Sequence, residues 1–189
     1  MKKKIVLVDS NAYFRLFLHL TPFLGRSIFG KFVFYILSDL EKEYQRSNRL
    51  QSKFEHFMKP EYVEDRKNTV PVKDLDIIKI DGYFEFIKSS ARQMNLTVSP
   101  VDIRYLAYCY NFKCAVVTDD IEMRELAEEL DITTYSLLEI LGILKNLNFI
   151  TIEKVREIVG HMKWNNDLSE NNIEQKYRDL FNEELPDYP

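Results

Sequence analysis

One short stretch in the second half of the chain limits its possible folds more than any other. Residues 115–117 are apolar, with two β-branched valines, and favour a buried strand that stops at Thr118, Asp119 and Asp120. Apolar residues then recur at helical spacing as far as Leu130, which predicts a helix directly after the aspartates. The two carboxylates would therefore lie at the carboxyl end of a strand, where open α/β sheets bind ligands.

Two interpretations of this aspartate pair are open at this point. Thr118 can cap the free amides of the helix, and acidic residues in a first turn offset the positive end of the helix dipole. Alternatively, two adjacent carboxylates with no lysine or arginine beside them in the sequence suit a hard divalent cation. The rest of the chain has to distinguish a helix cap from a metal site.

The start of the chain has the same arrangement. Residues 5–8 form a continuous apolar run, which is typical of a strand buried on both faces of a parallel sheet. Asp9 ends this run, and Ser10 or Asn11 can cap a following helix. Two strands are therefore expected to end on a carboxylate at the point where a helix begins.

Composition and charge exclude several classes of protein. The net charge is −4 and the sequence pI is about 5.5, so the chain as a whole does not attract nucleic acid, and a nuclease would need a local basic patch. Cys109 and Cys114 lack clustered histidines and are expected to be free thiols, not a zinc site. No uncharged stretch is long enough to span a bilayer, so we expect a cytoplasmic protein.

Between the two motifs the sequence predicts helices and one polar insertion. A helix is expected from about residue 27 to residue 46, with Asp39 and Glu43 one turn apart on the same face. Residues 46–73 mix charges with aromatic residues, which fits either a solvated insertion or a flexible segment that holds single-stranded nucleic acid. Its candidate contacts to nucleic acid are the basic residues Arg46, Arg49 and Lys53.

The later elements complete an α/β pattern. The cleanest amphipathic helix covers residues 77–94, and residues 96–98 are a short strand or an extended link. Ser99 is the expected cap of the next helix, with Asp102 in its first turn. A strand at 132–135 and a helix at 136–147 follow. Alternating strands and helices predict a parallel sheet with helices on both faces.

The expected domain organisation is one α/β domain and a helical extension. The domain covers residues 1–147 and carries the insertion at about 46–73. The extension covers residues 148–189 and is expected to hold two amphipathic helices, at 151–163 and 169–184.

The carboxylates become more informative when they are taken together. In one doubly wound domain Asp9, Asp102 and Asp120 would point toward the same sheet edge. Packed carboxylates repel each other and raise each other's pKa, so such a group is stable when a divalent cation neutralises it. Oxygen ligands without cysteine or histidine select Mg²⁺ or Mn²⁺ over zinc.

The order of these motifs resembles the PIN domain family of metal-dependent ribonucleases. The resemblance depends on IVLVDSN at 5–11, ILSDLE at 36–41, SPVD at 99–102 and VVTDD at 116–120. It covers roughly residues 1–145, apart from residues 46–80. It implies a Rossmann-like fold in which Asp9, Asp39, Asp102 and Asp120 are catalytic, Asp119 is an adjunct metal ligand and Thr118 supports the cluster. The family usually has glutamate in the second helix, so Glu43 is a rival to Asp39.

The resemblance also implies an activity and partners. The activity is hydrolysis of phosphodiester bonds in single-stranded RNA by metal-activated water, with Mg²⁺ or Mn²⁺ as cofactor. Ser10 or Asn11 would position the phosphate, and Arg124 would contact the RNA backbone. The protein would be a toxin of a toxin–antitoxin pair or an RNA-processing enzyme, with an antitoxin, another protein or a second copy as partner. The alternative is a catalytically inactive scaffold that binds nucleic acid or protein.

Overall fold

The computed structural model describes residues 3–168 and 172–187 of the chain. The chain divides into two compact units, residues 1–134 and residues 135–189, and each is described by itself. The first unit ends before residue 147, where the sequence suggested a boundary, because the helix that follows residue 136 packs with the later helices.

The described sheet has five strands in the order β2-β3-β1-β4-β5, and all of it except the last residue of β5 belongs to the first unit. Its strands are β1 (Lys4–Val8), β2 (Ser27–Ile28), β3 (Phe32–Tyr35), β4 (Ala115–Val117) and β5 (Thr134–Tyr135). The central strand β1 pairs in parallel with β3 and with β4, whereas β2 runs antiparallel to β3. The expected α/β class, with a mostly parallel central sheet, is confirmed.

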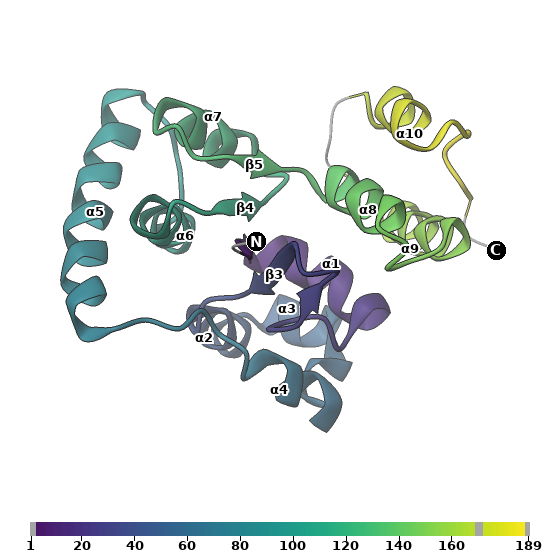
Figure 1. Ribbon diagram of the computed structural model, residues 1–189, viewed down its shortest axis with the longest axis horizontal. Coiled ribbons are helices and arrows are strands. Elements are labelled where there is room, and N and C mark those ends of the chain that lie inside the picture. Colours follow the sequence, from purple (N-terminus) through teal and green to yellow (C-terminus); the bar gives the residue numbers. More distant parts are fainter. Residues whose placement is uncertain (1–2, 169–171, 188–189) are drawn as a thin grey trace. The chain divides into compact units, whose positions relative to one another are not determined.

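Helices cover both faces of this sheet (Figure 1). They are α1 (Ser10–Leu20), α2 (Asp39–Arg46), α3 (Asn48–Lys53), η1 (Glu55–Met58, a 3-10 helix), α4 (Pro60–Arg66), α5 (Asp74–Gln93), α6 (Pro100–Phe112) and α7 (Ile121–Glu129). The connection after β1 leads through α1 toward β3, and the connection after β4 leads through α7 to the opposite edge. The carboxyl ends of β1 and β4 therefore form a switch point of the sheet, which is where open α/β sheets bind ligands.

One hydrophobic core joins the sheet to α5, α6 and α7. Leu7 of β1 and Val116 of β4 pack in it with Ile80 and Ile87 of α5 and with residues of α6 and α7. The helical spacing at 77–94 correctly predicted most of this face, but Ile77 is 47% exposed and lies outside the core. Residues 96–98 are an extended link without strand pairing in the described structure.

The prediction of a helix from about residue 27 to residue 46 is wrong in its first half. That half forms the β2–β3 hairpin, whose turn contains Phe29 and Gly30, both with positive φ. Phe32 and Tyr35, whose spacing fits a helix, are aromatic residues of high strand propensity and pair with β1, so sheet formation overrides the helical spacing. Only the second half is helical, and α2 begins at Asp39.

The segment at 46–73 is not the flexible or solvated insertion that its polarity suggested. It folds into α3, η1 and α4, and its residue Phe57 is fully buried, with its ring 4.2 Å from that of Tyr44 between centroids. Arg66 is also buried: its guanidinium lies 3.5 Å from the centre of the Phe57 ring and donates to the Phe57 carbonyl at 2.7 Å. An arginine that appeared to be part of a basic surface is therefore a packing residue.

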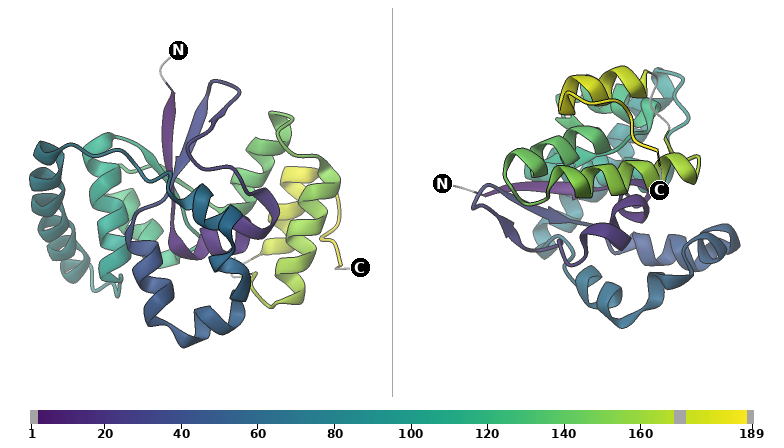
Figure 2. Two further views of the ribbon diagram at one scale, coloured as in Figure 1. Left: turned by 90° about the horizontal axis from the view of Figure 1, so that it is seen from below. Right: turned by 90° about the vertical axis from the view of Figure 1, so that its right-hand side faces the viewer.

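The described part of the second unit forms three helices, α8 (Leu137–Asn146), α9 (Ile152–Trp164) and α10 (Ile173–Phe181) (Figure 2). Ser136 and Glu139 form the capping box that the sequence suggests at the start of α8. Lys176 of α10 reaches the Glu139 carboxylate at 3.3 Å. The first residues of the helix expected at 169–184 lie outside the described residues. Across the described ranges, we find no helix with the length and apolar character needed to cross a membrane.

Replacement of Arg66 should destabilise the first unit. Arg66→Ala removes the contact with Phe57 and leaves a carbonyl oxygen without its donor, so we expect the free energy of unfolding to fall by about 2–4 kcal/mol. Urea denaturation would measure this loss. Lys67→Ala is the control, because Lys67 is exposed and its ion pair with Glu64 lies in solvent, so its loss should be under about 1 kcal/mol. Equal losses for the two variants would contradict a packing role for Arg66.

Candidate active site

The two acidic junctions are held side by side by strand pairing. Val8 and Val117 are register partners, and the backbone N–H of Asp9 donates to the Val117 carbonyl at 3.1 Å. Asp9 therefore leaves β1 next to the point where Thr118 leaves β4. This pairing joins positions more than a hundred residues apart, and it places both motifs at the switch point of the sheet.

Asp9 is the most deeply buried carboxylate of the site. It is 2% exposed and caps α1 by accepting a hydrogen bond from the Ala12 backbone N–H at 2.6 Å. The pKa of Asp9 is raised to about 7, mainly by burial and in smaller part by the nearby charges of Asp102 and Asp119, while hydrogen bonds from Thr118 and Ala12 act in the opposite direction. Asp9 is therefore a carboxylate whose negative charge is not fully compensated by its surroundings.

Asp120 and Asp119 have different environments although they are adjacent. Asp120 caps α7 by accepting from the Met123 backbone N–H at 2.7 Å, and its carboxylate is exposed. The Asp120 backbone N–H donates to the Thr118 hydroxyl at 3.1 Å. The helix cap is therefore Asp120 itself and not Thr118 as the sequence suggested, and a capping carboxylate at an exposed junction still has oxygen lone pairs for a ligand.

Asp119 is paired with a cation that the local sequence did not reveal. The Arg15 guanidinium of α1 lies 2.7 Å from Asp119, and the two side chains are only 16% and 8% exposed. No arginine is next to the aspartates in the sequence, but the fold brings Arg15 to Asp119. Because Arg15 neutralises Asp119, this carboxylate contributes less negative charge to the site than the sequence suggested.

Asp102 lies in the first turn of α6, where Ser99 fixes it. The Ser99 hydroxyl donates to the Asp102 carboxylate at 2.6 Å, and the Asp102 backbone N–H donates to the same hydroxyl at 3.2 Å. Burial raises the pKa of Asp102, and the charges of Asp120 and Glu43 raise it further. Asp102 is thus electrostatically linked to both Asp9 and Asp120.

Of the two acidic candidates in α2, Glu43 belongs with this group. Within the described part of the chain, one buried carboxylate oxygen of Glu43 has no hydrogen-bond partner, and its charge acts on Asp102. Asp39 instead contacts the Lys42 amine at 3.4 Å, and its charge acts on Tyr108. Sequence spacing alone did not distinguish Asp39 from Glu43 as the site residue, because the two lie one turn apart on α2.

The remaining polar candidates divide between the interior and the surface. Ser10 is buried directly after Asp9, whereas Asn11 is exposed at the start of α1. Tyr105 of α6, which the sequence did not single out, accepts from the Leu37 backbone N–H at 3.4 Å and ties α6 to the segment after β3. No sequence signal marks that role, because a buried tyrosine in a helix is usually a core residue.

The site offers only oxygen donors, which is the chemistry that hard divalent cations prefer. A carboxylate oxygen of Glu43 without a partner and the raised pKa values of Asp9 and Asp102 are consistent with a place for a cation. However, among the described residues no three His, Cys, Asp or Glu side chains already form a group that could hold a metal ion. The donor types fit Mg²⁺ or Mn²⁺, and the carboxylates would have to draw closer together to bind it.

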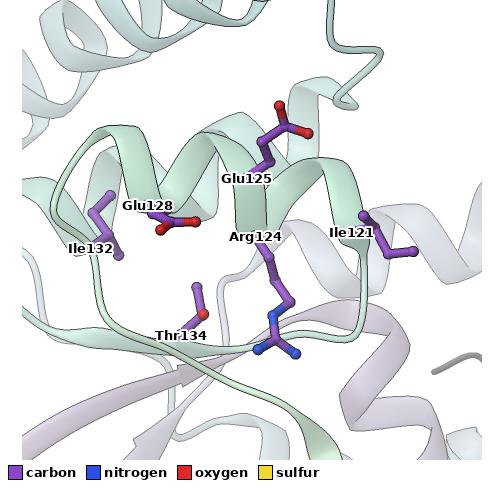
Figure 3. Close-up of a pocket in the computed structure, with 6 residues that line it drawn as sticks. All are labelled: Ile121, Arg124, Glu125, Glu128, Ile132 and Thr134. Atoms are coloured by element: carbon purple, nitrogen blue, oxygen red, sulfur yellow. The ribbon is translucent and has the colours of Figure 1, made fainter. Parts of the chain in front are cut away.

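The predicted basic contacts lie on different helices. Arg46, Arg49 and Lys53 are exposed on α2 and α3. Arg124 lines a separate hollow of about 400 Å³ on α7, together with Glu128, Thr134 and three further residues (Figure 3). Figure 3 shows the Arg124 guanidinium directed toward the strands, while Glu125 points away on the other side of the helix. The hollow carries charges of both signs, so it is not a basic surface.

Comparisons with known proteins find weak structural similarity and no match to a family or to a curated protein. No protein-family model matches the chain, and no curated protein matches it. The crystal structure of FitAcB from Neisseria gonorrhoeae is similar with a TM-score of 0.47 and 11% sequence identity, over 70% of this chain and 97% of that chain. This likeness is too slight to assign a family or an activity.

The raised pKa of Asp9 predicts how stability depends on pH. The folded protein keeps a proton on Asp9 up to about pH 7, whereas the unfolded chain loses it near 3.8, so stability from this group is present at low pH and is lost as pH rises between these values. Without divalent cations we expect the free energy of unfolding to fall by about 3 kcal/mol from about pH 5 to about pH 8. Asp9→Asn keeps the helix cap and should remove most of this fall. The same pH dependence in both proteins would contradict the assignment.

Replacement of Arg15 should remove the positive charge that offsets the buried Asp119 carboxylate. Arg15→Gln leaves a nearly buried carboxylate without its cation, so we expect a loss of about 2–3 kcal/mol in the free energy of unfolding at neutral pH. Arg178→Gln is the matched control, because Arg178 lies at the same distance of 2.7 Å from Glu184 but both side chains are largely exposed. Urea denaturation should show little change for this control. A small loss for Arg15→Gln would mean that the Arg15–Asp119 pair is not important for stability.

Proposed function

We propose that the chain is a divalent-metal-dependent nuclease of the PIN type that hydrolyses single-stranded RNA. The observation that carries this proposal is the burial of Asp9 at the switch point of the sheet, with a pKa raised to about 7 and with Asp102 and Asp119 acting on it. A buried carboxylate beside other carboxylates is destabilising for the fold on its own, and a site of this kind is a candidate for function.

In this proposal Asp9, Asp102 and Asp120 hold the cation, and Glu43 completes the group in place of Asp39. Thr118 orients the site, because its hydroxyl hydrogen-bonds Asp9 and accepts from the Asp120 backbone. A divalent cation bound there would activate water and offset negative charge on the phosphate. Arg15 holds Asp119 at the rim, where Asp119 is an adjunct to the other carboxylates.

Recognition of RNA is assigned to exposed groups of α2 and α3. Arg46, Arg49 and Lys53 can contact phosphates, which is the main source of affinity for nucleic acid. The ring of Phe54, which directly follows them, is stacked on the buried Phe14 with 5.0 Å between ring centroids, so it packs inside the chain and is not assigned to base stacking. Ser10 and Asn11, directly after Asp9, are the candidates to position the phosphate that is cleaved.

Cleavage of a fluorescent single-stranded RNA in the presence of Mn²⁺ tests the activity. Asp9→Asn and Asp102→Asn should each lower the rate by at least about 10–100-fold, because they remove a charged ligand without a large change in shape. Asp131→Asn is the control, since Asp131 is exposed in a turn with positive φ that asparagine tolerates. Equal cleavage by the Asp9→Asn variant and the wild type would refute the proposal.

The same assay decides which residue of α2 takes part. We expect Glu43→Gln to lower the rate more than Asp39→Asn, because only Glu43 acts electrostatically on Asp102. A larger effect of Asp39→Asn would restore Asp39 as the ligand. Growth arrest on expression of the wild type, but not of Asp9→Asn, would favour a toxin with an antitoxin partner over an RNA-processing enzyme.

A second candidate function is a scaffold of the same fold without catalysis. The observation that favours it is that Arg15 already neutralises Asp119, while no group of three ligands is preformed among the described residues. Calorimetric titration with Mn²⁺ distinguishes the two functions. Heat of binding that disappears in Asp9→Asn supports the nuclease, and the absence of heat together with retained RNA binding supports the scaffold.

A further inference from the structure

Helix α5 has apolar side chains on two opposite faces. One face, with Ile80, Ile87 and Ala91, is buried in the core. The opposite face carries Leu75, Ile78 and Phe86, which are 75%, 72% and 51% exposed. Figure 1 shows α5 as the outermost layer of its unit, with α6 between it and the sheet. Because a surface helix normally turns polar residues to water, the second apolar face indicates a contact surface.

Gly82 lies at the centre of this exposed face. A glycine inside a helix lowers its stability by about 1 kcal/mol relative to alanine, so its place here has a structural cost. A Cβ atom added to Gly82 would meet nothing within 4 Å, so packing inside the chain does not require the glycine. Gly82 opens a hollow with Tyr83 and Phe86 of α5 and Tyr110 of α6. A glycine at such a place allows a second helix to approach closely.

The two large apolar residues nearest to Gly82 on this face are symmetric about it. Ile78 lies four residues before it and Phe86 four residues after it. The charges are opposite at the two ends, since Asp74 lies eight residues before Gly82 and Arg92 ten residues after it. At 100° per residue these two side chains fall on the same side of the helix. In the part of the chain that the structure describes, neither residue forms an ion pair.

We propose that α5 packs against α5 of a second copy of this chain, antiparallel and with Gly82 at the two-fold axis. In that arrangement Ile78 faces Phe86 of the other copy, and Arg92 lies two residues, about 3 Å along the axis, beyond the level of Asp74 of the other copy, a distance that the long arginine side chain can span. A parallel arrangement would instead place Asp74 beside Asp74 of the other copy and Arg92 beside Arg92. A two-fold interface requires a self-complementary surface, and the reversal of charge along α5 supplies it.

Other charges on the same side of α5 are compatible with this pairing. Asp81 lies 3.4 Å from Arg104 of α6, and Glu85 lies 3.3 Å from Lys88, so both acidic residues near the axis already have partners within their own chain. The twenty residues of α5 extend over about 30 Å, so two such helices side by side can form the central part of a dimer interface. The proposal is independent of the nuclease assignment, since it uses none of the site residues.

Sedimentation analysis of the full chain over a range of concentrations tests the association. The wild type should dimerise, and Ile78→Lys should shift the dimer dissociation constant by at least about tenfold toward monomer. Ile121→Lys is the matched control, because Ile121 is also a strongly exposed isoleucine of a helix, and it should leave the dimer unchanged. Gly82→Leu should raise the thermal midpoint of the monomer by improving the helix while it weakens the dimer.

A charge exchange tests the orientation. Asp74→Arg and Arg92→Asp should each weaken the dimer, and the double variant should restore it. In oxidant, Gly82→Cys should give a covalent dimer, and Ile121→Cys should not. A wild type that stays monomeric at every concentration, or a dimer that withstands Ile78→Lys and Gly82→Leu, would overturn the proposal.

Discussion

Burial of a carboxylate where two parallel strands end is the constraint on which the rest of the structure depends. Asp9 is taken out of water by the β1–β4 pairing and is stabilised only in part, by the Ala12 backbone and the Thr118 hydroxyl. Asp102 and Asp120 reach the same region from α6 and α7, and Arg15 crosses from α1 to Asp119. The charges of Asp102 and Asp119 act on Asp9, and that of Asp120 acts on Asp102, so the helices around the switch point cannot be considered separately.

The sequence predicted those parts of the fold that depend on local signals. The strand–aspartate–helix motifs at Asp9 and Asp120, the Ser99 cap and the Ser136 capping box are all properties of a few consecutive residues, and the structure contains each of them. The β2–β3 hairpin was missed because Phe32 and Tyr35 also fit a helical spacing, and only their pairing with β1 decides between strand and helix.

The site itself was less predictable, because its key relations connect distant residues. The Arg15–Asp119 pair joins residues 104 positions apart, and no local sequence pattern indicates it. Polarity also misled in the segment at 46–73, where Arg66 is buried against Phe57 although arginine is usually a surface residue. Asp39 and Glu43 are one turn apart on α2, and what separates them in the structure, the unpartnered oxygen of Glu43 and its effect on Asp102, depends on a contact with α6 that sequence spacing does not reveal.

The long separation between β1 and β4 has a consequence during synthesis of the chain. Translation proceeds at about 5–20 residues per second, so β1 and α1 leave the ribosome several seconds before β4 is made. Until then Asp9 has no Val117 to pair with, and Arg15 has no Asp119. A nascent or truncated polypeptide that stops before β4 therefore lacks half of the acidic site, and the complete arrangement forms only when most of the first unit has emerged.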